Sequence, residues 1–242
     1  FNMEPNKSVK SLLYKSQFDD ANILEIGIDE AGRGPLFGPV FAAAGILPKD
    51  DSFDHSKMKD SKKFHSKKKI QEVANYIKEN AIAWSVCYES EKTIDDINIL
   101  QATQKAMHSC IKEITNTKLL KPSINCDTIR YNSIHLLIDG NYFVPIHRFN
   151  EGKKQLEYIP YTLVEGGDNK FSSIAAASIL AKVARDQFIS ELCESNPELD
   201  EKYGINSNKG YGAKRHIDGI NQHGITIWHR RTFGICKQFT DI

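Results

Sequence analysis

The sequence lacks the features that mark membrane, secreted or repetitive proteins. No apolar run approaches the ~18 residues of a membrane-spanning helix, and the N-terminal residues lack the charged and hydrophobic segments of a secretory signal. There is no internal repeat and no low-complexity tract. These absences predict a soluble, cytoplasmic protein that has no membrane partner.

Cysteine is too scarce and too scattered to form a disulfide framework or a zinc site. The chain of 242 residues has five cysteines, an odd number, and no C-x-x-C pair. A chain of this length can bury a substantial core without cross-links. The cysteine pattern therefore favours a reducing compartment.

An excess of one charge is also missing, because 32 basic residues face 31 acidic ones and the net charge is +1. To bind a nucleic acid, such a protein would need its acidic and basic residues to lie on separate parts of its surface. Acidic residues would gather in one site, and Lys and Arg would lie on the face around it.

Hydrophobic patterning predicts an α/β fold. After a loose lead-in over residues 1–22, strands are expected at 23–29, 40–47, 81–88, 134–139 and 161–164, and helices at about 69–79, 95–114 and 172–189. The first two strands should form a hairpin, and a charged loop covers 49–69. This alternation of strands and helices indicates one main domain over 23–195. A smaller helical extension is expected over 196–242, formed by 213–221 and the stretch 228–231.

Two adjacent acids end the first expected strand. Asp29 and Glu30 precede the glycine-flanked Arg33, and neighbouring side chains on a regular strand face opposite sides. Both carboxylates can therefore reach one site only where the strand ends. An isolated Asp-Glu pair is more often simply solvated, but the Gly-Arg-Gly-Pro sequence that follows favours a site where a cation and a phosphate meet.

Two further acids follow later strands. Asp139 before Gly140 could be an ordinary turn residue, and Asp168 could be an ordinary helix N-cap. All of these acids, however, lie at the carboxyl ends of strands or just beyond, where open α/β sheets place their ligands. Asp186 is excluded because it lies 18 residues after Asp168, about 27 Å along a helix. Its expected partner is Lys182, one turn earlier.

Four carboxylates in one cleft repel one another strongly, and two divalent cations would cancel their charge. Hard oxygen ligands suit Mg²⁺ or Mn²⁺. Two ions roughly 3.5–4 Å apart can stabilise the attacking and leaving oxygens of an in-line displacement at phosphorus. The acids therefore predict two-metal phosphodiester chemistry.

Several motifs in one order make the chain resemble a known family. They are Gly27-Ile28-Asp29-Glu30-Ala31-Gly32-Arg33-Gly34-Pro35, Asp60-Ser61-Lys62-Lys63, Leu137-Ile138-Asp139-Gly140-Asn141, Gly167-Asp168 with the run 173–183, Lys209-Gly210-Tyr211, and His229-Arg230-Arg231-Thr232-Phe233-Gly234. With this set, the chain resembles bacterial ribonuclease HII, the type 2 ribonuclease H. The lead-in is too short for the additional domain of ribonuclease HIII.

The resemblance implies a ribonuclease H-like fold, a central mixed sheet flanked by helices with a helical C-terminal extension. It implies hydrolysis of the RNA strand of RNA/DNA hybrids, and of the phosphodiester 5′ of a ribonucleotide embedded in duplex DNA. The products carry 3′-hydroxyl and 5′-phosphate ends, as in ribonucleotide excision repair. Asp29, Glu30, Asp139 and Asp168 would be the catalytic, metal-binding acids for two Mg²⁺ or Mn²⁺ ions. A monomer is expected.

The resemblance also implies substrate-binding residues. The backbone of Gly32, Arg33 and Gly34 would contact the ribose 2′-hydroxyl, and Tyr211 would pack against the neighbouring sugar. Lys62 would lie near the scissile phosphate, whereas Lys63 is equally well explained as solvated. Gly166 and Ala184 depart from the lysine and threonine common in the family.

Three other functions remain as alternatives. The Gly32-x-Gly34 spacing is similar to a dinucleotide-binding fingerprint, but the third glycine is misplaced at Gly38, and Pro35 and Pro39 oppose the helix that pyrophosphate would need. A DNA recombinase or resolving nuclease could use the same acids. A non-catalytic hybrid-binding protein would not need the intact acid set.

Overall fold

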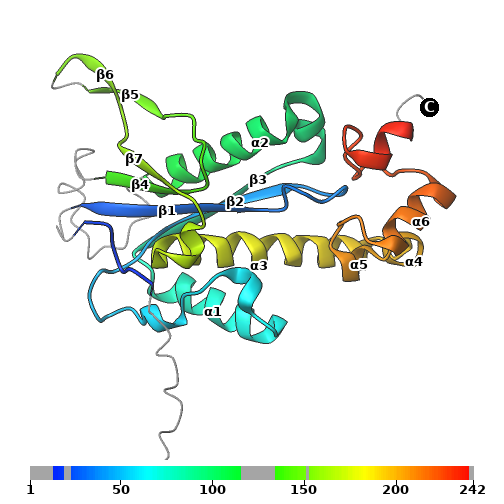
Figure 1. Cartoon of the computed structure of the whole chain (residues 1–242), viewed down its shortest axis with the longest axis horizontal. Coiled ribbons are helices and arrows are strands. Elements are labelled where there is room, and N and C mark those ends of the chain that lie inside the picture. Colours follow the sequence, from blue (N-terminus) through cyan, green and yellow to red (C-terminus); the bar gives the residue numbers. More distant parts are fainter. Residues whose placement is uncertain (1–12, 19–22, 116–133, 151–152, 240–242) are drawn as a thin grey trace, which may run out of the picture.

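Five strands form one mixed sheet with β1 (Leu24–Ala31) at its centre (Figure 1). β1 pairs antiparallel with β2 (Val40–Ile46), which confirms the hairpin, and parallel with β4 (Ile134–Asp139). β3 (Ala83–Glu89) extends the sheet beyond β2, and β7 (Tyr161–Val164) extends it beyond β4. The parallel trio β1, β4 and β7 therefore ends at one edge of the sheet.

The computed structural model describes residues 13–18, 23–115, 134–150 and 153–239. α2 (Glu91–Ile114) covers one face of the sheet, and α3 (Ser172–Ser195) covers the other with α1 (Lys67–Asn80) outside it (Figure 1). The smaller elements are η1 (His55–Lys57), η2 (Ser61–Lys63), β5 (His147–Asn150), β6 (Gln155–Tyr158), η6 (Gly167–Asn169), α4 (Glu198–Tyr203), α5 (Ile205–Asn208), α6 (Lys214–His223) and η7 (Gly234–Phe239).

β1 and α3 approach each other at backbone distance. A Cβ built on Gly27 would lie 2.2 Å from the backbone carbonyl carbon of Ser173, so only glycine fits there. Small side chains on α3, among them Ala175, Ala176 and Ala177, are fully buried under the sheet. This close contact fixes the distance between β1 and α3, and so the position of the acids at the end of β1 relative to that helix.

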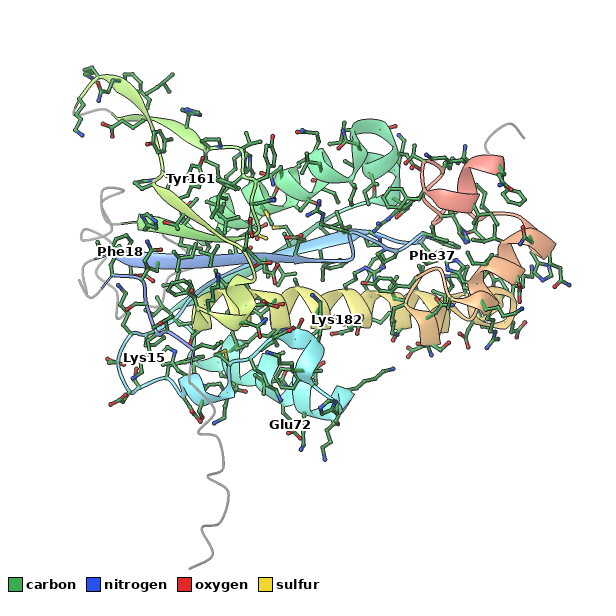
Figure 2. All side chains as sticks on the ribbon, viewed as in Figure 1. Lys15, Phe18, Phe37, Glu72, Tyr161 and Lys182 are labelled. Atoms are coloured by element: carbon green, nitrogen blue, oxygen red, sulfur yellow. The ribbon has the colours of Figure 1, made fainter. Side chains whose placement is uncertain are left out.

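The C-terminal elements pack around the far end of α3. Phe37, in the loop after β1, is fully buried there among Ile189, Leu199 and Ile220 (Figure 2). α6 confirms the helix expected at 213–221, but the stretch 228–231 is not helical. This stretch instead lies beside the loop that follows β1, and an antiparallel bridge joins Phe37 to His229. The buried backbone groups of that loop need hydrogen-bond partners, which the stretch supplies.

The lead-in is more ordered than expected over residues 13–18. Tyr14 bridges to Phe171, and the backbone N–H groups of Gln17 and Phe18 donate to the Glu25 carboxylate at 2.9 and 2.8 Å. The polar composition of this segment gave no sign of the docking: Phe171 is distant in sequence, and Glu25, although only seven to eight residues away, lies on β1.

Two further differences concern the start of α2 and a small second sheet. α2 begins at Glu91 rather than 95, capped by Ser90, and it kinks at Asn98, whose φ is 67°. The two-stranded sheet of β5 and β6, which extends from the main sheet in Figure 1, was not predicted. Its strands have four residues each, too short for a clear alternation.

The predicted α/β class and the sheet flanked by helices are confirmed. The division at residue 195 stays a prediction, and residues 240–242 lie outside the described part of the chain. Within the described ranges, none of the helices combines the length and hydropathy that a bilayer crossing requires.

The Gly27 contact predicts a large stability difference between two paired glycines. Gly27→Ala should lower the free energy of unfolding by about 3 kcal/mol or more, because its methyl group would meet backbone that cannot move aside. Gly45→Ala is the matched control, since Gly45 is the β2 partner of Gly27 and its Cβ would meet only a 4.0 Å contact. Urea unfolding measures both, and equal losses would contradict this account.

Candidate active site

The sheet edge that carries the ends of β1 and β4 opens into a pocket of about 310 Å³. All of the site residues predicted from the sequence line it, namely Asp29, Glu30, Gly32, Arg33, Gly34, Lys62, Asp139, Asp168 and Tyr211. Five further lining residues were not predicted: Ala31, Ser61, Ser178, Lys182 and Arg185. The structure thus brings together residues that are up to 182 positions apart.

The four acids reach the pocket from three strand ends. Asp29 and Glu30 lie near the end of β1. Both residues still pair with β2, but they lie beyond Ile28, the last residue of β1 that pairs with β4. Asp139 is the last residue of β4, and Asp168 lies in η6 after β7. The prediction that adjacent acids share a site near a strand end is consistent with this placement.

Burial and mutual repulsion disfavour the charged forms of these acids. Burial raises the pKa of Asp29 well above its ordinary value, and the charges of Glu30 and Asp139 raise it further. Burial likewise raises the pKa of Glu30 and of Asp168, and the negative charge of Asp139 acts on both. The negative charge of Asp139 therefore acts on each of the other three acids, and that of Asp60 acts on Asp168 as well.

Hydrogen bonds orient each carboxylate. Asp139 Oδ1 accepts from the Gly167 backbone N–H at 2.6 Å, which ties β4 to the loop that carries Asp168. Asp29 accepts from the Glu30 backbone N–H at 2.7 Å and from the hydroxyl of Ser178. The Ser178 hydroxyl is in turn 3.0 Å from that of Ser61, so α3 and the 60–63 segment meet beneath Asp29.

The 60–63 segment is docked to the loop of Asp168. Asn169 Nδ2 donates to Asp168 Oδ1 at 3.0 Å and to Asp60 Oδ2 at 3.4 Å, while Lys63 pairs with Asn169 Oδ1. Lys62 lines the pocket, and its positive charge opposes the rise in the pKa of Asp168 that burial causes. Lys63 does not line the pocket, and its side chain binds Asn169 instead.

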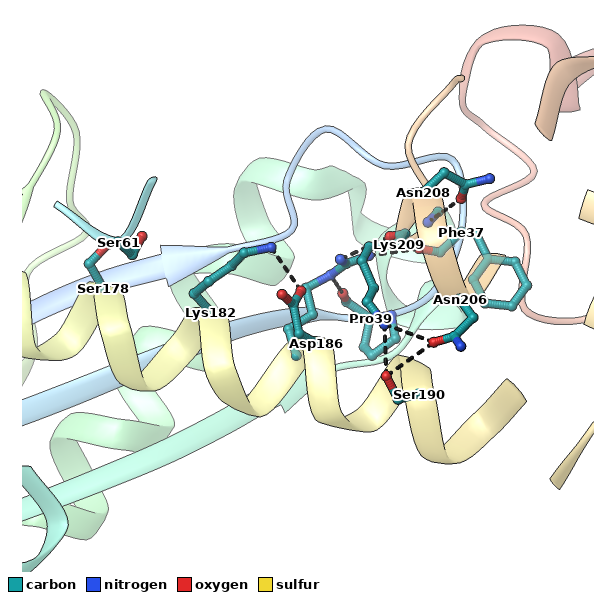
Figure 3. A network of polar contacts seen from close by, with 12 residues as sticks. Phe37, Pro39, Ser61, Ser178, Lys182, Asp186, Ser190, Asn206, Asn208 and Lys209 are labelled. Atoms are coloured by element: carbon teal, nitrogen blue, oxygen red, sulfur yellow. Dashed lines mark hydrogen bonds and ion pairs between the residues drawn. The ribbon is translucent and has the colours of Figure 1, made fainter. Parts of the chain in front are cut away.

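Cations offset part of the negative charge around the pocket. Arg33 Nη1 lies 3.2 Å from Glu30 Oε1, and this pairing opposes the rise in the Glu30 pKa. Lys182 Nζ binds Asp186 Oδ1 at 2.8 Å, as predicted, and Figure 3 draws this pair on α3. Asp186 itself does not line the pocket, which confirms its exclusion.

The two glycines of the Gly-Arg-Gly loop have different surroundings. Gly32 has a φ of +90°, and a Cβ there would lie 2.1 Å from Arg185 Nε, so this glycine is required by the buried arginine beneath it. At Gly34 the nearest atom to a built Cβ is Tyr211 Cε1, at 3.7 Å. Room for a ligand to approach the backbone therefore exists at Gly34, whereas the positive φ and Arg185 explain Gly32, so the single reason expected for both glycines does not cover Gly32.

Tyr211 stands on a firmly held segment. Its ring is 47% exposed, and the Arg185 guanidinium lies 6.0 Å from the ring centre. The preceding Lys209 is buried, with Nζ donating to Ser190 Oγ at 2.7 Å and to Asn206 Oδ1 at 3.1 Å (Figure 3).

Two buried histidines hold the backbone of Tyr211 from the other side. His216 Nδ1 lies 2.9 Å from the Tyr211 carbonyl oxygen, which can only accept, so Nδ1 carries the proton. His216 Nε2 then accepts from His229 Nε2, 3.1 Å away, and His229 Nδ1 accepts from the Thr226 backbone N–H. Burial, followed by the charge on His216, lowers the pKa of His229 to about 3.

Comparison with known proteins identifies the family. The sequence profile of the family described as Ribonuclease HII matches residues 26–236. The Ribonuclease HII of Parabacteroides distasonis is 44% identical over 215 residues, which cover 89% of this chain and 92% of that protein.

Solved structures share the fold at lower identity. The ribonuclease H2 of Pyrococcus horikoshii has a TM-score of 0.62 and 20% identity, with 90% of this chain and 98% of that one covered. Bst-RNase HIII in complex with Mn²⁺ has a TM-score of 0.52 and 15% identity, with 83% and 70% covered. Given the profile match and the identity to named relatives, this chain belongs to the ribonuclease HII family and is a ribonuclease of the hydrolase class.

Proposed function

We propose that this protein hydrolyses the RNA strand of RNA/DNA hybrids and the phosphodiester 5′ of a ribonucleotide embedded in duplex DNA. The observation that carries the proposal is the single pocket lined by four carboxylates, the Gly-Arg-Gly loop and Tyr211. Carboxylates alone would fit any metal-dependent nuclease. The adjoining loop and aromatic ring supply surfaces that can tell a ribose from a deoxyribose.

Asp29, Glu30, Asp139 and Asp168 would hold two Mg²⁺ or Mn²⁺ ions. The donors are hard oxygens, and the raised pKa values of Asp29, Glu30 and Asp168 reflect burial and repulsion that a nearby cation would relieve. Among the described residues, no three His, Cys, Asp or Glu side chains form a ready-made metal cage. Mg²⁺ at phosphoryl-transfer sites commonly uses one or two carboxylates and completes its shell with water and substrate phosphate, so an open set of acids fits.

Bound ions would activate water and stabilise charge on the phosphate oxygens. The protein's own residues orient the substrate. Lys62 supplies a positive charge beside the phosphate, and the exposed backbone at Arg33 and Gly34 approaches the ribose. Tyr211 offers a half-exposed ring on which the next sugar can pack. The Gly-Arg-Gly loop and Tyr211 would thus recognise the sugar on one side of the pocket, and the ions held by the carboxylates would promote hydrolysis on the other.

The first test is cleavage of a labelled duplex that contains one ribonucleotide. With Mg²⁺ or Mn²⁺ we expect a single cut on its 5′ side, leaving 3′-hydroxyl and 5′-phosphate ends, and no cut in EDTA. Asp139→Asn should lower the rate by roughly 10²–10³-fold, because charge stabilisation at the phosphate is lost. Asp218→Asn on α6, an exposed acid paired with Lys214, is the control. Equal cleavage of an all-DNA duplex would refute the proposal.

Without metal, removal of one charge should stabilise the protein. Asp29→Asn keeps an oxygen for the Glu30 N–H and Ser178 but removes a buried charge whose pKa is raised. Thermal unfolding in EDTA should therefore show a melting temperature a few degrees above that of the wild type. Added Mg²⁺ should stabilise the wild type more than the variant. A lower melting temperature in EDTA would mean that Asp29 is not under repulsive strain.

Tyr211→Ala should lower kcat/KM for the single-ribonucleotide duplex by about 10- to 100-fold, the usual loss when a stacking ring is removed. Because the ring is half-exposed, the melting temperature should change little. Tyr211→Phe keeps the ring and should stay close to the wild type. If the Phe variant lost as much activity as the Ala variant, the hydroxyl rather than ring packing would be responsible.

A further inference from the structure

Two buried arginines lie under the loop that follows β1. Arg185 on α3 is 1% exposed and Arg230 is fully buried, yet neither takes part in the ion pairs found among the described residues. Their hydrogen bonds go to backbone carbonyls instead. A buried guanidinium without a carboxylate partner is costly, so its hydrogen bonds must hold something in place.

Arg230 donates to three carbonyls of this loop. Its Nη2 lies 2.6 Å from the Gly32 oxygen, its Nη1 2.9 Å from the Arg33 oxygen and its Nε 2.8 Å from the Gly38 oxygen. These contacts span 192 to 198 positions of sequence. The planar fork of the guanidinium can meet three carbonyls together, which an ammonium group cannot match.

Arg185 completes the support. It donates to the Phe37, Pro39 and Lys209 carbonyls at 3.1, 3.1 and 3.0 Å. Because Lys209 precedes Gly210 and Tyr211, one side chain joins the Gly-Arg-Gly side of the pocket to the Tyr211 side.

The position of each carbonyl fixes the direction of the next N–H. In a trans peptide the C=O of one residue and the N–H of the next point in opposite directions, and the described chain has no cis peptide. With the Gly32 and Arg33 carbonyls turned inward to Arg230, the N–H groups of Arg33 and Gly34 must turn outward. Both residues are exposed and line the pocket.

These two N–H groups have no acceptor within the described part of the chain. Two residues further on the pattern reverses, because the Leu36 N–H donates to the Gly210 oxygen and the Gly38 N–H to the Trp228 oxygen, each at 2.8 Å. The N–H groups of Arg33 and Gly34 are therefore adjacent unused donors on residues that line the carboxylate pocket.

We propose that Arg230 is a positioning residue for ribonucleotide recognition, which aims the N–H groups of Arg33 and Gly34 at the ribose 2′-hydroxyl by holding the two preceding carbonyls. This inference rests on the proposed function. It assigns the discrimination between ribose and deoxyribose to a side chain that never touches the substrate.

The test compares Arg230→Lys with Arg215→Lys. Arg215 also donates to backbone carbonyls, those of Asp200 and Glu201, but it lies away from the pocket. Each protein is assayed for kcat/KM on the single-ribonucleotide duplex, for affinity to the matched all-DNA duplex, and for melting temperature.

For Arg230→Lys we expect kcat/KM on the ribonucleotide duplex to fall by ~100-fold, since a small misplacement of binding groups has an effect of that order. Affinity for the all-DNA duplex depends on phosphate contacts and should stay within about twofold of the wild type. Arg215→Lys should match the wild type in both assays.

Three results would overturn the proposal. They are unchanged ribonucleotide cleavage by Arg230→Lys, a fall in its affinity for the all-DNA duplex as large as its fall in kcat/KM on the ribonucleotide duplex, and unfolding of Arg230→Lys at the assay temperature while Arg215→Lys stays folded. Amide hydrogen exchange of the wild type adds a check that needs no variant. The N–H groups of Arg33 and Gly34 should exchange fast, and those of Leu36 and Gly38 slowly. A wild type that does not prefer the ribonucleotide duplex would instead refute the proposed function.

Discussion

Repulsion among buried carboxylates is the constraint around which this molecule is built. Four acids share one pocket, and burial opposes ionisation of at least three of them. Such a cluster would relax by moving apart if its supports were soft. Here the acids stand on paired strand ends, and the Gly167 N–H ties Asp139 to the loop of Asp168. The fold therefore sustains an unfavourable charge arrangement, which the cations of the proposed function would relieve.

Rigid backbone contacts supply the resistance to that repulsion. Gly27 lets β1 lie directly on the backbone of α3, and Gly32 lets the loop lie on Arg185. The same helix thus supports the acids through one glycine and the Gly-Arg-Gly loop through the other. Because both supports are on α3, the carboxylates and the Gly-Arg-Gly loop are held in a fixed position relative to each other.

Much of this could be predicted from the sequence. Strand alternation located the five sheet strands, and the acids at their ends are brought to one pocket as expected. What escaped prediction depends on contacts between distant residues. The Arg230 bonds join positions almost 200 apart, and the inward face of Gly32 is occupied by Arg185, so no local pattern could reveal either. The helix expected at 228–231 is absent for the same reason, because this stretch is held by its bridge to the distant Phe37.

The paired rings of His216 and His229 have a consequence for acid conditions. One proton lies between their facing nitrogens, and a second would set two donors against each other in a buried site. The pKa of His229 is about 3 in the folded protein and close to 6.5 in an unfolded chain. Below about pH 6.5 the unfolded chain therefore binds more protons at this position, and stability falls as the pH drops toward 3. Since His216 holds the backbone of Tyr211, protonation of this histidine pair should loosen the Tyr211 side of the pocket. Acid should therefore disturb that side while the strand ends that carry the four carboxylates still hold.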